Sequence, residues 1–226
     1  IDYKYNEQGL VSEQSYNYGS TNYKLKYDYD TKFNCIGLTY TQRNGGVNEE
    51  SWSYSYDDKN RLKSVKNNKT AKVEASYEYD ISGSLIKQTF GNGVVTNYEY
   101  NAGNMLLKMT NSKNGSEISK YNYTYSTDGN IIESFSEFRE KNSAVSNEEA
   151  KYTYDGFGRL TIERHTKKQN DDVLYVNNKA YDYDTLGNRI KMRSFGGPGA
   201  YNIRYEYDND NKLLKEIKSN GETTRY

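Results

Sequence analysis

The sequence lacks the elements on which several protein classes depend. Its 226 residues include one cysteine, Cys35, and one proline, Pro198. A single cysteine excludes an intrachain disulfide, and we expect a buried thiol that behaves as a small apolar side chain. One proline excludes a polyproline linker. No apolar run approaches the ~20 residues of a transmembrane helix and no signal peptide is visible, so we expect no membrane insertion and place any export signal outside this segment.

An excess of charge of one sign is also missing. Lys and Arg together number 31 and so do Asp and Glu, which gives a formal net charge of zero. Binding to nucleic acid or to an anionic membrane normally needs a basic face. We therefore expect no nucleic-acid partner, although positive and negative groups could still separate between the two faces of a sheet.

Tyrosine is what the sequence has in abundance. It occurs 26 times, and aromatic residues make up 15% of the chain. Aliphatic residues are scarce, so average hydrophobicity alone would suggest disorder. Each buried ring, however, removes roughly 150–250 Å² from water, which at about 25 cal/mol per Å² amounts to several kcal/mol. Because the tyrosines are spaced and not scattered, they can form an ordered core.

A short pattern recurs nine times along the chain: Tyr-x-Tyr, then Asp, Asn or Ser, a turn, and an aliphatic residue. The second tyrosines of the nine copies are Tyr5, Tyr29, Tyr56, Tyr79, Tyr100, Tyr125, Tyr154, Tyr183 and Tyr207. Their spacing varies from 21 residues between Tyr79 and Tyr100 to 29 between Tyr125 and Tyr154. Such variation excludes a solenoid of identical rungs and indicates similar strands joined by loops of different length.

The local chemistry of one copy predicts a strand followed by a turn. Tyr-x-Tyr places two rings on one face of a strand and the polar residue between them on the other. The Asp or Asn that follows ends the strand, because its side chain can accept hydrogen bonds from nearby backbone amides. Gly158 and Gly187 then supply a positive φ. Asn34, Asn60 and Asn211 stand at or near the same position, and asparagine tolerates that conformation.

A second strand and a second turn complete each unit. Residues 159–164 alternate as a strand does, and Asn-Gly or Gly-Gly hairpin signals follow in most units, at 44–46, 91–93, 114–115, 196–199 and 220–221. Nine units predict an all-β fold, a continuous antiparallel meander of about eighteen strands over residues 1–226 as a single array. The chain opens almost directly on a repeat, and Tyr226 stands where a tenth would begin. We therefore expect an internal segment of a larger protein.

The pattern resembles the YD repeats of the RHS family. Residues 154–160 (Tyr-Asp-Gly-Phe-Gly-Arg-Leu) and 183–190 (Tyr-Asp-Thr-Leu-Gly-Asn-Arg-Ile) match it closely, and seven looser copies extend over essentially the whole chain. The family includes bacterial RHS toxins, wall-associated proteins, Tc toxin shell components and teneurins. The resemblance implies a sheet curled into a spiral or partial shell, in a bacterial protein that is secreted or displayed on the cell surface.

The resemblance also implies partners. In the toxins the shell encloses a cytotoxic C-terminal domain, so the remainder of the parent polypeptide, including such a domain, is the expected partner. A toxin's repeat region usually closes with a segment around an Asp-Pro-x-Gly sequence. No Asp-Pro occurs here, since Pro198 follows a glycine. We therefore expect the cleavage site and the toxin itself to be absent from this chain.

Catalytic and metal sites are poorly supported by the sequence. His165 is the only histidine, and we expect it on a strand end or in a loop as a solvated residue without a nucleophile nearby. Residues 208–211 (Asp-Asn-Asp-Asn) resemble the start of a calcium loop, but Leu213 and Ser219 stand where glycine and glutamate are required. We expect a turn there, and no enzyme activity, cofactor or metal.

The tyrosine rows admit two functions. In a scaffold, cross-strand aromatic pairs each contribute roughly 0.2–1 kcal/mol, and the chain is a non-catalytic segment of a shell or stalk. In a binding module for adhesion, exposed rings, Trp52 and Tyr54 in particular, would stack on cell-surface carbohydrate. We favour the scaffold, because the chain has too few aliphatic residues to form a core without tyrosine. Exposed edge strands would also permit edge-to-edge self-association.

Overall fold

The computed structural model describes residues 1–139, 144–170, 172–197 and 199–226. These residues form nineteen β-strands and no helix, which confirms the predicted all-β class. No helix capable of crossing a membrane is therefore found among them. The predicted turn at 196–199 includes Pro198, which lies outside the described residues.

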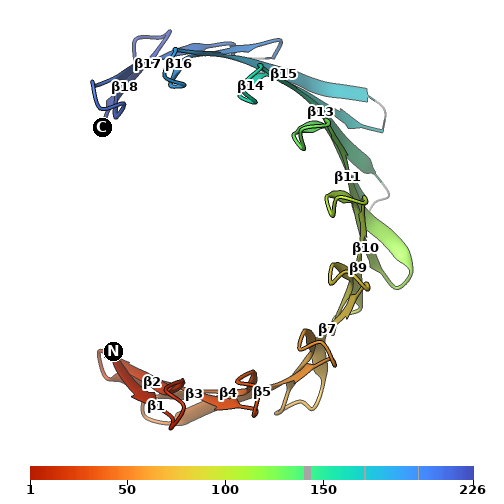
Figure 1. Ribbon diagram of the computed structural model, residues 1–226, viewed down its shortest axis with the longest axis vertical. Helices are drawn as coiled ribbons and strands as arrows, with labels where there is room; N and C mark the ends of the chain where they lie inside the picture. Colours follow the sequence, from red (N-terminus) through yellow and green to blue (C-terminus); the bar gives the residue numbers. More distant parts are fainter. Residues whose placement is uncertain (140–143, 171, 198) are drawn as a thin grey trace. The chain divides into compact units, whose positions relative to one another are not determined.

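The strands follow one another along the chain with short connections (Figure 1). They are β1 Asp2–Tyr5, β2 Val11–Tyr18, β3 Thr21–Tyr29, β4 Cys35–Arg43, β5 Val47–Tyr56, β6 Leu62–Asn67, β7 Val73–Tyr79, β8 Leu85–Phe90, β9 Val94–Tyr100, β10 Leu106–Lys113, β11 Ser116–Tyr125, β12 Ile131–Arg139, β13 Val145–Tyr154, β14 Leu160–Gln169, β15 Asp172–Tyr183, β16 Arg189–Phe195, β17 Asn202–Tyr207, β18 Leu213–Lys218 and β19 Thr223–Arg225.

The chain divides into two compact units. Unit 1 comprises Ile1–Asn97 with Lys113–Gly115, and unit 2 comprises Tyr98–Ser112 with Ser116–Tyr226. In unit 1 each strand from β1 to β8 pairs antiparallel with the next. In unit 2 the same holds from β11 to β18. The meander is thus confirmed, with nineteen strands where about eighteen were expected, because β19 adds a short strand before Tyr226.

The strands form a single layer with little interior. The buried apolar residues are Ala75, Ala150, Met192, Ile203 and Tyr205. The accessible surface is 14842 Å², whereas a compact monomer of this mass would expose about 10,600 Å². The described strands therefore have no second layer of structure across the sheet, and side chains pack mainly along it.

The absence of a second layer corrects one expectation about Cys35. Its thiol was expected to be buried, but Cys35, the first residue of β4, is only half-buried. Partial burial raises the pKa of the thiol, and the Sγ atom lies 3.3 Å from the carbonyl oxygen of Gly37. A single sheet cannot bury a side chain as completely as a two-layered domain can.

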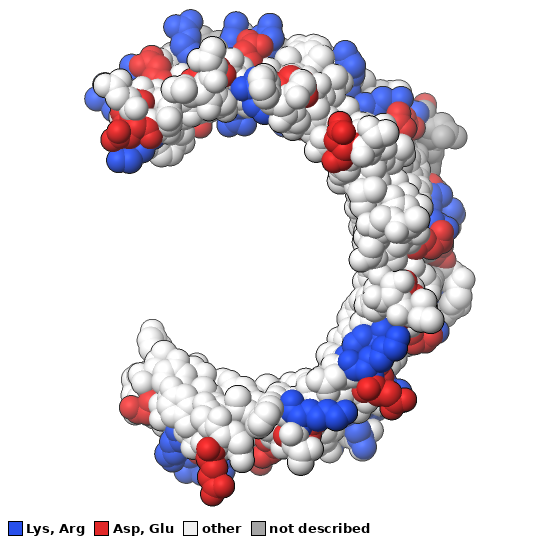
Figure 2. Space-filling model, viewed as in Figure 1, with Lys and Arg blue, Asp and Glu red and all other residues white. Residues whose placement is uncertain are grey.

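The two faces of the sheet differ in chemistry. Directly opposed residues of antiparallel strands share a face, and one face, here called the tyrosine face, carries both tyrosines of each Tyr-x-Tyr. On the other face the residue between the tyrosines is often ion-paired with the residue opposite. Such pairs, at 2.8–3.0 Å, are Lys4–Glu13, Glu78–Lys87, Glu99–Lys108 and Glu206–Lys215. On the side seen in Figure 2, positive and negative groups are interspersed.

A β-bulge stands at the second tyrosine of eight copies. The register shifts immediately before Tyr5, Tyr29, Tyr56, Tyr79, Tyr125, Tyr154, Tyr183 and Tyr207. In one example Thr153 pairs with Ile162 and Tyr154 with Leu160, so that one residue of β14 is left between two pairs. Bulges bend a strand and increase its right-handed twist, and the sheet within each unit is accordingly curved (Figure 1).

Candidate functional site

Each Tyr-x-Tyr segment leads into the same five-residue turn, here called a motif turn. In all nine, the backbone amide of the first residue donates to the carbonyl of the fifth, and the amide of the fourth donates to the carbonyl of the first. Motif turns 1 to 9 are residues 6–10, 30–34, 57–61, 80–84, 101–105, 126–130, 155–159, 184–188 and 208–212. The segment 208–211 is therefore part of a turn, as predicted.

The first side chain of the motif turn holds the loop together. Oδ1 of Asp184 accepts hydrogen bonds from the amides of Leu186 (3.0 Å) and Asn188 (2.8 Å). The same pair of contacts recurs at Asp155 in motif turn 7 and in motif turns 1, 2, 3, 5 and 9. This arrangement is the Asx turn that the sequence pattern predicts.

The fourth residue of every motif turn has a positive φ. Gly158 has φ 77° and Gly187 has φ 92°, and Asn60 and Asn211 occupy the same position in motif turns 3 and 9. In motif turn 2 the expectation was wrong: Phe33, with φ 67°, holds that position, and not Asn34. The closing hydrogen bonds fix this conformation whatever the side chain, so Phe33 adopts it at a cost of about 1–2 kcal/mol.

The hydroxyl of the second tyrosine joins each repeat to the repeat before it. In seven copies it donates, at 2.7–3.0 Å, to the carbonyl of the residue that directly follows the preceding motif turn. The pairs are Tyr29–Val11, Tyr56–Cys35, Tyr79–Leu62, Tyr125–Leu106, Tyr154–Ile131, Tyr183–Leu160 and Tyr207–Arg189. Tyr5, in β1, is 62% exposed. These tethers satisfy phenols whose rings are half-buried, and burial raises the pKa of Tyr154 and Tyr183.

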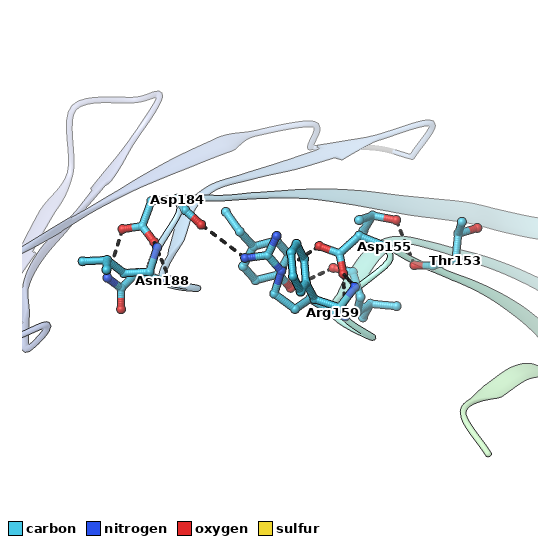
Figure 3. Close-up of polar contacts among 10 residues, drawn as sticks. Thr153, Asp155, Arg159, Asp184 and Asn188 are labelled. Atoms are coloured by element: carbon cyan, nitrogen blue, oxygen red, sulfur yellow. Dashed lines mark hydrogen bonds and ion pairs between the residues drawn. The ribbon is translucent and has the colours of Figure 1, made fainter. Parts of the chain in front are cut away.

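Arginine at the fifth position joins consecutive motif turns (Figure 3). The Nε atom of Arg159 lies 2.6 Å from Oδ2 of Asp155, and Nη1 donates to the carbonyl of Asp184 at 3.2 Å. Its guanidinium carbon lies 4.8 Å from the centre of the Tyr183 ring. Arg61 makes the same three contacts, to Asp57 (2.7 Å), the carbonyl of Asp80 (3.0 Å) and the Tyr79 ring (4.5 Å).

Asparagine at the fifth position joins motif turns in a second way. Nδ2 of Asn188 donates to Oδ1 of Asn211 at 2.9 Å. Asn34 and Asn60 exchange a reciprocal pair of amide hydrogen bonds. Together with the arginines, these contacts form what we call the turn ladder, which runs along one edge of the sheet within each unit.

We expect the motif turns to make stability depend on pH. The amide of Asn188 and nearby backbone amides hold the pKa of the Asp184 carboxyl below its ordinary value, and Asn34 does the same for Asp30. A carboxyl with a lowered folded-state pKa adds stability above its unfolded pKa of about 4, and that stability is lost as the pH falls through the folded value. We expect thermal melts to show destabilisation below about pH 4.

The variant Asp184→Asn tests this dependence. Asparagine keeps the Oδ1 acceptor, as Asn6 and Asn101 do in motif turns 1 and 5, so the turn should survive with a shallower dependence of the melting temperature on pH. Asp128→Asn, an exposed change inside motif turn 6, is the control. An acid profile that is identical in wild type and Asp184→Asn would contradict the assignment.

His165 does not lie where the sequence suggested. It stands in the middle of β14, half-buried, and not on a strand end in solvent. Nδ1 lies 2.7 Å from Oε1 of Glu148, and Nε2 lies 3.6 Å from Oε2 of Glu163. Partial burial raises the pKa of Glu163, but the hydrogen bonds from Lys179 and Tyr181 outweigh it and the pKa lies below the ordinary value.

The His165 cluster has the chemistry of a structural hydrogen-bond network that includes the Lys179–Glu163 ion pair. Within the described residues its ring nitrogens contact carboxylates and no hydroxyl or thiol, so the base–nucleophile pair of a hydrolase is not assembled. Nor does the described part of the chain bring three potential metal ligands together. Sequence reasoning missed the cluster because Glu148 and His165 meet only through the register that pairs Ala150 with His165.

A shallow groove of about 250 Å³ lies beside His165 on the tyrosine face of unit 2. Small residues of β12 and β13, Ser134, Ser136 and Ala150, line it together with the rings of Tyr123 and Tyr152. Aromatic rings together with a few polar groups are typical of the lining of small-molecule sites, and Glu148 and His165 add ionisable side chains to this lining.

Trp52 and Tyr54, the predicted carbohydrate contacts, are both half-buried in β5. Nε1 of Trp52 donates to Oε2 of Glu74 at 3.0 Å, and Oε1 of Glu74 accepts from Asn67. Burial raises the pKa of Tyr54. The indole is therefore held within the packing of the sheet, which fits a structural residue; its contact with carbohydrate stays a prediction.

Comparison with known proteins identifies the family. Residues 65–226 match the family model described as teneurin YD-shell. The chain is 28% identical over 170 residues to the tRNA3(Ser)-specific nuclease WapA of Bacillus spizizenii, and 27% identical over 173 residues to the tRNA nuclease WapA of Bacillus subtilis (strain 168). Each alignment covers 69% of this chain and 7% of the relative.

A solved structure, the Photorhabdus luminescens Tc holotoxin pore, aligns with 96% of this chain and 16% of its own, at 14% identity and a TM-score of 0.47. The chain therefore spans a small part of the length of the relatives that it matches. The family model covers well over half of the chain, in the region that contains motif turns 4 to 9. The protein belongs to the teneurin YD-shell family.

Proposed function

We propose that this chain is a non-catalytic segment of a large secreted or cell-surface protein, where it forms part of an encapsulating shell or stalk. The observation that carries the proposal is the set of seven tyrosine tethers, each of which joins one repeat to the preceding repeat. Together with the single-layered sheet, these tethers support the proposal of a wall that is extended one repeat at a time. The family membership supports the same function.

The partners in this proposal are the remainder of the parent polypeptide and a toxin domain enclosed by it. The WapA relatives are named as tRNA nucleases, and this chain matches 7% of their length. We place any such activity in a part of the parent protein outside this segment. On its own, the chain should leave tRNA intact; cleavage that is abolished by His165→Ala would contradict the non-catalytic assignment.

Deletion of one whole repeat from the parent protein tests the proposed shell. Removing residues 155–183 joins Tyr154 to Asp184 and so preserves the Tyr-Asp-turn sequence of the repeat. We expect the β-rich circular dichroism spectrum to remain, while the enclosed part becomes accessible to protease. Trp52→Ala, which alters one ring without shortening the sheet, is the control. Equal protease resistance in the deleted and intact proteins would count against an enclosing wall.

A second candidate function, carbohydrate binding in adhesion, rests on the groove beside Tyr123 and Tyr152. A glycan array of the 226-residue chain should then show saturable binding to one sugar class. Loss of binding in Tyr123→Ala would place the site in the groove, whereas loss in Trp52→Ala would place it on β5. No binding by a folded, β-rich chain would leave the structural function alone.

A further inference from the structure

The turn ladder lacks a rung between motif turns 1 and 2, both of which lie in unit 1. The fifth residue of motif turn 1 is Leu10, where motif turns 3 and 7 have Arg61 and Arg159. A leucine has no donor with which to reach the next turn. The first residue is Asn6, and its Oδ1 already accepts from the amides of Gln8 (3.1 Å) and Leu10 (2.9 Å).

A groove of about 620 Å³ lies between these two turns. Its lining includes the rings of Tyr27, Tyr29 and Phe33 and the two acidic residues Asp28 and Asp30, and no lysine or arginine. Lys32 acts electrostatically on Asp30 but is not part of the lining. The groove therefore combines aromatic surface with the acidic Asp30 and has no cation in its lining, which favours binding of a cation.

The filled rungs show which cation the groove would accept. The Tyr79 hydroxyl reaches Leu62 just as the Tyr29 hydroxyl reaches Val11, so the two rings are equivalent. Over Tyr79 lies the guanidinium of Arg61, which also donates to the carbonyl of Asp80. That carbonyl already accepts from the fourth residue of its own turn and uses its second lone pair for the arginine.

The carbonyl of Asp30 has the equivalent first partner, the backbone amide of the fourth residue of its own turn. It accepts from the amide of Phe33 at 3.1 Å, as the carbonyl of Asp80 accepts from Gly83 at 3.2 Å. No arginine of the described residues reaches it. We propose that the groove between motif turns 1 and 2 binds a guanidinium group, supplied by an arginine side chain of a partner protein. The guanidinium stacks on Tyr29 and donates to the Asp30 carbonyl, while the Asp30 carboxylate balances its charge.

Arginine suits this site better than lysine does. A guanidinium is planar, stacks on an aromatic face and donates in two directions at once, whereas an ammonium is a compact, strongly hydrated charge. Arg61 and Arg159 use both properties at the equivalent place in the same chain. The site does not depend on whether the parent protein is a shell or a stalk.

Amide chemical shifts of the isotope-labelled 226-residue chain test the proposal. The probe is N-acetyl-arginine amide, and the matched neutral control is N-acetyl-citrulline amide, which has the same shape without the charge. We expect saturable shifts at residues 30–33 with the arginine probe and none with citrulline. Residues 80–83 and 184–187, where Arg61 and Arg159 already occupy the site, serve as internal controls and should not shift.

Two variants sharpen the test. Leu10→Arg should fill the missing rung from within the chain and abolish binding of the probe. Tyr29→Leu should weaken binding about two- to fivefold, as expected for the loss of one exposed cation–π contact. Equal shifts at all motif turns, equal binding of citrulline, or equal binding of N-acetyl-lysine amide would each overturn the assignment of a guanidinium site. Unchanged probe binding in Leu10→Arg would do so as well.

Discussion

Replacing Tyr183 with alanine is expected to lower the free energy of unfolding of unit 2 by about 3 kcal/mol, the lower end for removal of a large aromatic side chain. The ring packs beneath the guanidinium of Arg159, and its hydroxyl donates to the carbonyl of Leu160 at 2.7 Å. Both contacts join one repeat to the next. Tyr183→Phe keeps the ring and loses only the hydrogen bond, which should cost about 1 kcal/mol.

Hydrogen exchange is the appropriate measurement, because stability in a repeat array is distributed over neighbouring units and need not be lost in one step. Exchange in Tyr183→Ala should accelerate in β14, β15 and β16 first. Tyr175→Ala is the matched control, since Tyr175 lies on the same strand and face but is 37% exposed and makes no tether. If both variants open β14–β16 equally, the tether adds nothing beyond ring burial.

Gly158→Val is expected to destabilise unit 2 by about 2 kcal/mol, the upper range for a residue forced into the left-handed region. Gly158 has φ 77°, and a Cβ there would meet no atom closer than 3.8 Å. The penalty therefore comes from the backbone and not from a clash, and β-branching adds to it. Gly158→Asn should be nearly neutral, because Asn60 and Asn211 already hold that position.

The control for Gly158→Val lies two residues earlier in the same turn. Gly156 has open space around it and no positive φ, so Gly156→Val should change stability much less. Urea unfolding of the three variants separates the cases. A loss in Gly156→Val as large as in Gly158→Val would show that bulk in the turn, and not its conformation, determines the effect.

Much of the fold could be predicted from the sequence because two local rules act without tertiary help. The Tyr-x-Tyr spacing assigns both rings to one face, and the following Asx residue closes a turn through its own side chain, as Asp155 and Asp184 do. Repetition of these rules nine times leaves few alternatives to a meander. The position of the positive φ was misjudged by one residue at Phe33, because an adjacent asparagine looked more suitable.

The contacts between consecutive repeats could not be predicted from the sequence in the same way. The acceptor of each tyrosine hydroxyl is a backbone carbonyl, which any residue supplies, so Val11, Cys35 and Arg189 serve equally. The bulge before the second tyrosine is likewise not marked by any particular residue type in the sequence. Arginine in the turn ladder did leave a signal: an acid followed four residues later by arginine, at 57–61 and at 155–159.

The constant offset of the tyrosine tethers has a consequence for how such chains change over time. Hairpin length varies between units, from six and seven residues in β8 and β9 to ten and twelve in β14 and β15. In the seven tethered copies the hydroxyl nevertheless reaches the same place, five residues beyond the first residue of the preceding motif turn. Insertions and deletions are therefore absorbed at the far margin of the sheet, where hairpins can lengthen or shorten in residue pairs. One margin is held in phase by the tyrosine tethers, and the other can vary in length.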